Sequence, residues 1–178
     1  MTQINKHPSI EAFKFCPNCG QNKLSNDEIK TLICQDCNFT FYFNPAAAVA
    51  IIIENRNNEI LLLSRALDPQ KGMLDLPGGF VDPFETLEEA IIREIMEELN
   101  ISIAKLDYLV SKPNRYPYKN VTYQTVDIVF YTKLDNDLNI TLSDENQEFH
   151  WIRPAAIDLE KLAFSSTKNI ISSFIKNN

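Results

Sequence analysis

All four cysteines of the chain lie in its N-terminal segment, in two C-x-x-C pairs. Cys16 and Cys19 form the first pair, Cys34 and Cys37 form the second, and 14 residues separate the pairs. Two such turns can bring four thiolates onto one tetrahedral zinc ion. A segment as short as residues 1–44 buries little apolar surface, so a bound metal would supply most of its folding free energy. The spacing therefore predicts a structural zinc site in a small domain over residues 1–44, which is followed by a larger domain over residues 45–178.

Two other uses of C-x-x-C pairs are considered. Disulfides would require export, and the N-terminal residues show neither an apolar core nor a small-residue cleavage site. A redox pair is expected within a βαβ unit, which this segment does not resemble. Gly20 and Asn38 follow the second cysteine of each pair. Both residue types adopt positive φ with little strain, which favours the tight turn of a metal-binding pair.

Composition narrows the class of protein and its partners. Hydrophobic residues make up 44 % of the 178 residues and charged residues 23 %, as in soluble globular proteins. The chain contains no apolar stretch long enough for a membrane span, so we expect a soluble, cytoplasmic protein with no membrane partner. The formal net charge is −7, which makes nucleic acid an unfavourable partner. A small-molecule partner and a possible homodimer are consistent with these features.

The pattern of apolar residues predicts an α/β fold. Strands are expected over residues 46–53, 59–64, 101–110, 121–134 and 149–152, and helices over residues 86–99, 154–162 and 166–176. A loop rich in Pro and Tyr is expected to join the third strand to the fourth. Several strands adjacent in sequence, mixed with a few helices, predict a mixed β-sheet sandwiched between helices.

The predicted helix over residues 86–99 carries acidic residues next to its apolar face. Leu87, Ile91, Ile95 and Leu99 recur every four residues and should face the core. Glu94 and Glu98 lie one turn apart, and around the helix axis their midpoint is about 60° from this apolar row. Glu97 lies at a larger angle from the row. Carboxylates beside a buried face repel one another unless a cation neutralises them, and Mg²⁺ or Mn²⁺ prefers such oxygen ligands. The alternative interpretation is an acidic helix face exposed to solvent.

The residues around this helix resemble the signature of the Nudix hydrolases, G-x5-E-x7-R-E-U-x-E-E-x-G-U, where U is bulky and apolar. The chain matches at Gly79, Glu85, Arg93, Glu94, Ile95, Glu97, Glu98 and Ile101. It departs at Asn100, where the family has Gly, and Asn is the next-best residue for a left-handed helix end. The domain-wide resemblance covers residues 46–151, and it implies a Nudix fold for the larger domain.

The resemblance also implies roles for these residues. Glu94 and Glu98 correspond to the principal ligands of the catalytic Mg²⁺ or Mn²⁺, Glu97 to a further ligand or a group that positions water, and the Gly78 carbonyl to another ligand. Glu85 and Arg93 belong to the same catalytic set, and an ion pair that braces the loop against the helix suits them better than a direct reaction. Family members often take one more acid from a later loop. Glu145 and Glu148 are the candidates, and the spacing to Trp151 in zinc-ribbon members favours Glu145.

Further positions are candidates for substrate binding. Arg65 ends a predicted strand and would either approach a phosphate or form a surface ion pair. Asp127 lies within an apolar strand, where it either lines the substrate cleft or pairs with a basic group. Phe80 belongs to the loop between Gly79 and Glu85 and is included as a contact.

A zinc ribbon followed by a Nudix domain resembles the NADH pyrophosphatases, whose motif S-Q-P-W-P-F-P-x-S follows the helix. Here Ser111, Pro113 and Pro117 match and Tyr116 replaces Phe, whereas the Trp, the central Pro and the final Ser are missing. Tyr116 or Tyr118 would stack on a base, and Arg115 would contact a phosphate or ribose; otherwise the loop only packs on the ribbon. The resemblance implies a metal-dependent pyrophosphohydrolase that cleaves a nucleoside diphosphate linked to another moiety, with NAD(H) first and ADP-ribose next. A nucleotide-sensing module without catalysis is the alternative.

Overall fold

The computed structural model describes residues 10–27, 29–134 and 138–177. The chain divides into two compact units, each described by itself. One contains the chain up to Pro45 and the segment Arg115–Gln124, and the other contains Ala46–Asn114 and the chain from Thr125 onward. The first nine residues of the small domain predicted from the sequence lie outside the described residues.

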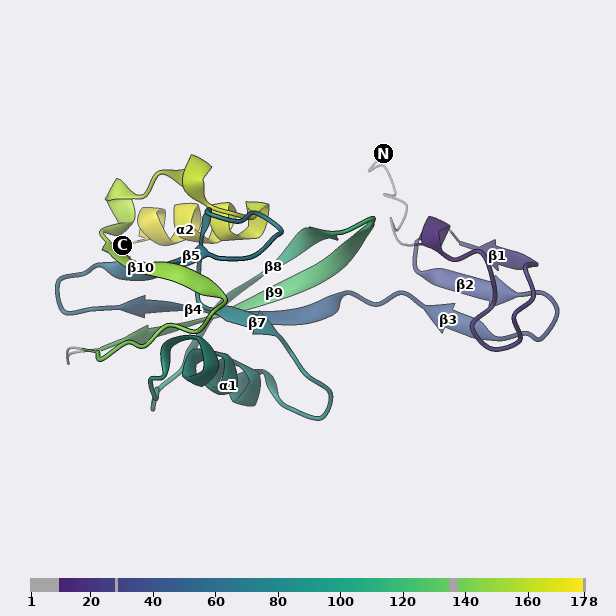
Figure 1. The fold of residues 1–178 in the computed structure, drawn as a ribbon, viewed down its shortest axis with the longest axis horizontal. Helices are drawn as coiled ribbons and strands as arrows, with labels where there is room; N and C mark the ends of the chain where they lie inside the picture. The colour runs from purple at the N-terminus through teal and green to yellow at the C-terminus, as the bar shows by residue number, and fades with distance from the viewer. Residues whose placement is uncertain (1–9, 28, 135–137, 178) are drawn as a thin grey trace. The chain divides into compact units, whose positions relative to one another are not determined.

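The N-terminal unit is built on a three-stranded antiparallel sheet (Figure 1). Its strands are β1 (Leu24–Asn26), β2 (Thr31–Cys34) and β3 (Thr40–Tyr42), and the one-turn 3-10 helix η1 (Ile10–Ala12) precedes them. A small apolar core contains Ile10, Leu32 and Phe43 with Phe13 and Phe41 packed against it. The phenyl rings of Phe41 and Phe43 meet edge to face at 4.9 Å between centroids. This core is small, in agreement with the need for a metal.

The larger unit holds a seven-stranded mixed sheet with the strand order β10-β5-β4-β9-β8. Parallel pairing of β4 with β9, from Ala46–Thr125 to Glu54–Lys133, forms its centre. The pairings of β5 with β10, β4 and β6, and of β4 with β7, are antiparallel. Two short strands of the sheet lie outside this order: β6 pairs with β5, and β7 pairs with β4. The bounds are β4 (Ala46–Glu54), β5 (Ile60–Arg65), β6 (Leu74–Asp75), β7 (Gly78–Phe80), β8 (Asp107–Tyr118), β9 (Val121–Lys133) and β10 (Asn146–Ile152).

Two α-helices cover opposite faces of this sheet (Figure 1). Helix α1 (Leu87–Leu99) packs Ile91, Ile95 and Leu99 against Ile51 and Ile53 of β4. Helix α2 (Ser165–Asn177) packs Ile170, Ile171 and Phe174 against the other face, beside Ile52. Side chains of a strand alternate between the two faces, so the unbroken apolar run of β4 supplies both layers of core. The predicted mixed sheet between helices is confirmed.

Most elements of the larger unit agree with the sequence analysis, and four differ. The segment expected as a loop rich in Pro and Tyr belongs to β8, which begins at Asp107 rather than at residue 101. Pro113 and Pro117 fit this strand because β8 is at the edge of the sheet, where a missing N–H breaks no inner ladder. The helix expected over residues 154–162 is instead two 3-10 turns, η2 (Pro154–Ala156) and η3 (Leu159–Lys161). Strands β6 and β7 were not predicted, because each is only two or three residues long.

None of the helices within residues 10–27, 29–134 and 138–177 combines the length and the apolar character that crossing a membrane requires.

Candidate functional site

Two glycines let the loop before α1 approach both the sheet and the helix. Gly78 has φ +142°, and a Cβ there would lie 2.7 Å from the Ala50 Cα, so a side chain would collide with β4. A Cβ at Gly79 would collide with the carboxylate of Glu94. Both glycines pair with β4, opposite Ala50 and Val49. The glycine pair therefore brings the backbone of β7 directly against the acidic face of α1.

Glu98 is the most buried acid of α1, with 9 % of its surface exposed. Its two carboxylate oxygens each accept a hydrogen bond, Oε2 from the Gly78 N–H at 2.8 Å and Oε1 from the Asn146 side-chain amide at 2.9 Å. Burial raises the pKa of Glu98 to about 7, although these two hydrogen bonds lower it, and the nearby Glu94 raises it further.

Glu94 lies one turn before Glu98, and its carboxylate is largely covered, with 15 % of the side chain exposed. Burial raises the pKa of Glu94, the Arg93 guanidinium opposes this rise, and the charges of Glu97 and Glu145 add to it. Glu97 is more open, with 60 % of its side chain exposed. The three acids thus form a graded row, from buried Glu98 to exposed Glu97.

Arg93 joins the loop to the helix through a two-pronged ion pair. Its Nη2 and Nε donate to the two oxygens of Glu85 at 2.6 and 3.1 Å, and Nη2 also donates to the Phe80 carbonyl at 3.0 Å. Its Nη1 donates to Glu94 at 2.8 Å and to Glu97 at 3.2 Å. The hydrogen bonds from Arg93 lower the pKa of Glu85. This geometry supports the bracing role expected for Glu85 and Arg93, which stays a prediction.

The donor set at α1 fits a hard divalent cation. Glu94, Glu97 and Glu98 supply only carboxylate oxygens, and the two buried members have pKa values raised by burial and mutual charge, which a cation would offset. Within the described part of the chain, these glutamates do not converge as tightly as the four cysteines, whose ligand atoms lie within 4.8 Å of one another. The Arg93 guanidinium contacts Glu94 and Glu97 on the exposed side.

The two later acids differ in their surroundings. The charge of Glu145 contributes to the raised pKa of Glu94, so Glu145 lies near the acidic row of α1. Its carbonyl accepts the Ala66 N–H at 2.9 Å, which joins its loop to the end of β5. Glu148 is exposed and faces His150, with 3.8 Å between Glu148 Oε2 and His150 Nε2. This arrangement supports the preference for Glu145 over Glu148, which stays a prediction.

Arg65 and Asp127 both contact polar groups of the larger unit. Arg65 Nη1 lies 3.4 Å from Asp75 Oδ2, its Nε donates to the Pro69 carbonyl, and its guanidinium covers the Phe164 ring. Arg65 thus forms an ion pair, although a largely covered one rather than the surface pair that the sequence analysis gave as one alternative. Asp127 accepts a hydrogen bond from the Thr125 hydroxyl at 2.8 Å and pairs in register with Ala48 of β4. A role of either residue in substrate binding stays a prediction.

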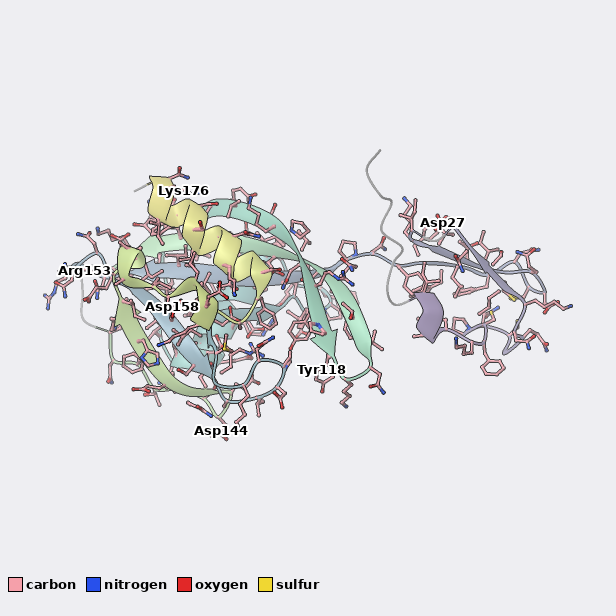
Figure 2. The ribbon with its side chains drawn as sticks, turned by 90° about the horizontal axis from the view of Figure 1, so that it is seen from above. Asp27, Tyr118, Asp144, Arg153, Asp158 and Lys176 are labelled. Carbon is pink, nitrogen blue, oxygen red and sulfur yellow. The ribbon has the colours of Figure 1, made fainter. Side chains whose placement is uncertain are left out.

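The other candidate substrate residues lie at two places. Arg115, Tyr116 and Tyr118 lie near the tip of the β8–β9 hairpin, in the segment grouped with the N-terminal unit. Figure 2 labels Tyr118 at this tip. The rings of Tyr116 and Tyr118 stack at 6.5 Å between centroids. Phe80 ends β7 with its ring 42 % exposed, and its carbonyl accepts from Arg93. Their roles toward a substrate stay predictions.

Sequence reasoning missed two residues of this region, Asp75 and Asn146. Asp75 is a half-buried acid that accepts hydrogen bonds from the Thr167 hydroxyl at 2.9 Å and the Leu76 N–H at 3.0 Å. Burial raises the pKa of Asp75 to about 6, while Arg65 lowers it. An acid between Leu74 and Leu76 is a signal that could have been found, since apolar neighbours indicate burial. No comparable signal marks Asn146.

The four cysteines of the N-terminal unit form a second candidate metal site. The sulfurs of Cys16 and Cys37 lie 3.7 Å apart and those of Cys19 and Cys34 3.6 Å apart, which suits four thiolates around one zinc ion. Gly20 and Asn38 have positive φ, as predicted, and their N–H groups donate to the carbonyls of Cys16 and Cys34. Hydrogen bonds from the Phe39 N–H and the Asn18 amide lower the pKa of Cys37, whereas hydrogen bonds with the other cysteines, Cys37 first, raise the pKa of Cys19. The four thiols thus act as one coupled group, in which a bound cation would favour the thiolate form of each.

Comparisons with known proteins agree with this fold. The family model of the NUDIX domain matches residues 44–174. The NAD-capped RNA hydrolase NudC of Escherichia coli O1:K1 is 30% identical over 140 residues, which are 79% of this chain and 51% of that protein. The Shigella flexneri protein of the same name is 33% identical over 125 residues, 67% of this chain and 48% of that protein. The chain thus spans about half the length of the curated relatives it matches.

A solved structure extends the similarity over nearly the whole chain. The NUDIX hydrolase from Nitrosomonas europaea is 28% identical and superimposes with a TM-score of 0.68, covering 93% of this chain and 92% of that one. Together with the glycine loop, the acidic row of α1 and the Glu85–Arg93 brace, these matches place the chain in the Nudix family.

Proposed function

We propose that this protein is a metal-dependent pyrophosphohydrolase that cleaves the diphosphate of a nucleoside diphosphate linked to another moiety. The single observation that carries the proposal is the buried carboxylate of Glu98, held by Gly78 and Asn146 and flanked by Glu94 and Glu97. An NAD(H)-like dinucleotide is the first candidate substrate and ADP-ribose the second. Cleavage of NAD(H) would give AMP and nicotinamide mononucleotide.

Each residue of the site has a part in this proposal. Glu94 and Glu98 would hold Mg²⁺ or Mn²⁺, with the Gly78 carbonyl, Glu97 and Glu145 as further ligands or as groups that orient water. When bound, such a cation neutralises the diphosphate and lowers the pKa of a water molecule toward neutral pH. The ion pair between Arg93 and Glu85 holds the loop before α1 in place against this helix. The loop and the carboxylates of α1 would then face the same metal.

The proposed substrate preference rests on weaker observations, the partial match at residues 111–119 and the names of the curated relatives. Those names add NAD-capped RNA to the candidates, since its cap carries the same diphosphate. The net charge of −7 favours the free dinucleotide over an RNA chain. The zinc proposed for the four cysteines is structural, because four protein ligands leave no position for water.

A substrate panel with Mg²⁺ or Mn²⁺ tests the proposal. NADH, ADP-ribose, NAD-capped RNA and nucleoside triphosphates are compared by product analysis for the wild type, Glu98→Gln and Glu94→Gln. We expect dinucleotide cleavage, with a loss of about 100-fold or more in either variant. Glu88→Gln, an exposed position in the first turn of the same helix, serves as the matched control and should keep full activity.

Preference for a triphosphate over both the dinucleotide and ADP-ribose would contradict the substrate assignment. The alternative is a nucleotide-sensing module, and tight binding of NADH or ADP-ribose without turnover by the folded wild type would favour it.

A further inference from the structure

Glu98 is attached to the loop before β10 through both its main chain and its side chain. The Glu98 carbonyl accepts the Ser143 N–H at 3.0 Å, and its Oε1 accepts the Asn146 side-chain amide at 2.9 Å. Glu145, the proposed loop ligand, lies between these two points of attachment. The position of Glu145 relative to α1 is therefore set by residues on both sides of it.

The two oxygens of Glu98 are held from different elements. The Gly78 N–H of β7 donates to Oε2, and the Asn146 amide of β10 donates to Oε1. Two donors from opposite sides fix the rotation of the carboxylate plane. Each carboxylate oxygen accepts more than one bond, so one donor per oxygen leaves capacity for a cation.

The side chain of Asn146 is not needed to hold its own strand. Asn146 pairs with Arg65 in the β10–β5 ladder, and its N–H donates to the Ser143 carbonyl at 3.3 Å. The register shifts between Asn146 and Glu148, as in a β-bulge, which changes the direction in which a side chain points. The backbone of the strand is thus fixed independently, and the amide is available for Glu98.

From this geometry we propose that Asn146 is a positioning residue of the metal site. Its amide holds the Glu98 carboxylate in the orientation that a divalent cation requires, and it fixes the loop that carries Glu145. The inference rests on the proposed function, because it takes Glu98 as a metal ligand. Hydrogen bonds of this kind to a ligand affect metal affinity, and their loss typically costs 10- to 100-fold.

Binding of Mn²⁺ tests the inference without turnover. Free Mn²⁺ is counted by electron paramagnetic resonance during titration of the zinc-loaded full chain, for the wild type, Asn146→Ala, Asn146→Leu and Glu98→Gln. Leucine has the same branched skeleton as asparagine, with bulkier ends and no donor, so it reports on the hydrogen bond if the alanine variant does not fold. Asn55→Ala is the matched control, because its amide also donates to a glutamate at 2.9 Å, Glu59, in the β4–β5 turn.

We expect the dissociation constant for Mn²⁺ to rise about 10- to 100-fold in both Asn146 variants and to stay unchanged in Asn55→Ala. The same variants should need correspondingly more Mg²⁺ for half-maximal activity while keeping KM for the nucleotide at saturating Mg²⁺. Wild-type Mn²⁺ affinity in a folded Asn146→Leu protein, with affinity lost in Glu98→Gln, would overturn this inference alone. Wild-type affinity in Glu98→Gln as well would overturn the proposed metal site and this inference with it.

Discussion

Asp75 is a carboxyl group whose surroundings work against its charge. It lies half-buried in β6, where its Oδ2 faces Arg65 and its Oδ1 accepts a hydrogen bond from the Thr167 hydroxyl. Burial outweighs the charge of Arg65, so the pKa of Asp75 rises from 3.8 to about 6. The folded state then holds a proton that the unfolded state releases between these two pH values. The contribution of Asp75 to stability is therefore present below about pH 4 and is lost as the pH rises through about 6.

The stability of Asp75→Asn, relative to that of the wild type, should therefore be higher at neutral pH than at acidic pH. Asparagine keeps an oxygen for Thr167 and Leu76 and has no proton to lose. The difference between 3.8 and about 6 corresponds to roughly 3 kcal/mol, so the variant's free energy of unfolding should gain up to that amount relative to the wild type between pH 4 and pH 7. Urea unfolding at both pH values measures it, and an unchanged difference would contradict the assignment.

Arg93→Lys should weaken the brace of the site without removing its charge. A lysine cannot reach both oxygens of Glu85 and the Phe80 carbonyl at once, as the guanidinium does. We expect a loss of about 1–3 kcal/mol in the free energy of unfolding. A double-mutant cycle with Glu85→Gln checks the cause, since a zero coupling energy would mean that the pair does not act as a unit.

Much of the candidate site could be predicted from the sequence because its residues lie close together along one helix. The periodicity of α1 placed Glu94 and Glu98 beside its apolar face, and the structure buries both. Asp75 and Asn146 could not be found in this way. They contact their partners Thr167 and Glu98 across long separations in sequence, and no local pattern encodes such contacts.

At the scale of elements, both ends of α1 are capped by the residue types that favour a helix boundary. The Thr86 side chain accepts the Glu89 N–H, and the Glu89 carboxylate accepts the Thr86 N–H, which forms a capping box. At the other end Asn100 adopts the left-handed conformation, with φ 54° and ψ 41°. This confirms the expectation that Asn100 replaces the glycine of the Nudix signature in the same conformation.

Asn100→Gly should thus leave the helix intact, and Asn100→Val should not. Glycine adopts positive φ without strain, so we expect a free energy of unfolding equal to the wild type or higher by up to about 1 kcal/mol. A β-branched residue at this φ should cost about 1–2 kcal/mol. Thermal unfolding of both variants measures the difference, and equal stability of the valine and glycine variants would rule out this role of Asn100.

Strand β8 shows why a segment predicted as a loop is a strand in the structure. Prolines at 113 and 117 indicate a loop when only the local sequence is considered. The structure makes the segment an edge strand, and this depends on which neighbours the sheet supplies. The tip of the same hairpin carries Tyr118, followed by Lys119 at φ 52°, with the Lys119 ammonium over the Tyr118 ring (Figure 2).

At the scale of the whole molecule, the two units differ in what stabilises them. The larger unit has two apolar cores, one on each face of its sheet. The N-terminal unit has one small cluster and four convergent cysteines. This difference in what stabilises the two units could be predicted from the sequence, since all cysteines precede Asn38 and the long apolar runs follow Pro45.

Loss of the metal should therefore affect the two units unequally. We expect about one equivalent of zinc per chain by elemental analysis of protein purified without chelator. Cys34→Ser should release this zinc and unfold the N-terminal strands, because their core is too small to hold them. Resonances of the α1 and α2 cores, followed by nuclear magnetic resonance, should stay dispersed. Purified protein without zinc, or an N-terminal unit that stays folded in the variant, would contradict the prediction.

The parallel ladder of β4 and β9 has a consequence for synthesis of the chain on the ribosome. Ala46 pairs with Thr125 and Glu54 with Lys133, so β4 meets this neighbour only after everything between them has been made. The β4–β5 turn can close early, whereas α1 emerges before β9 completes the centre of the sheet beneath it. The nascent chain thus carries an apolar strand with an open edge for much of its elongation, and exposed apolar strands of this kind are prone to aggregate. Chains released before residue 121 should accordingly aggregate, whereas chains that extend through α2, which covers the second face of the sheet, should not. Light scattering of the released chains measures the difference.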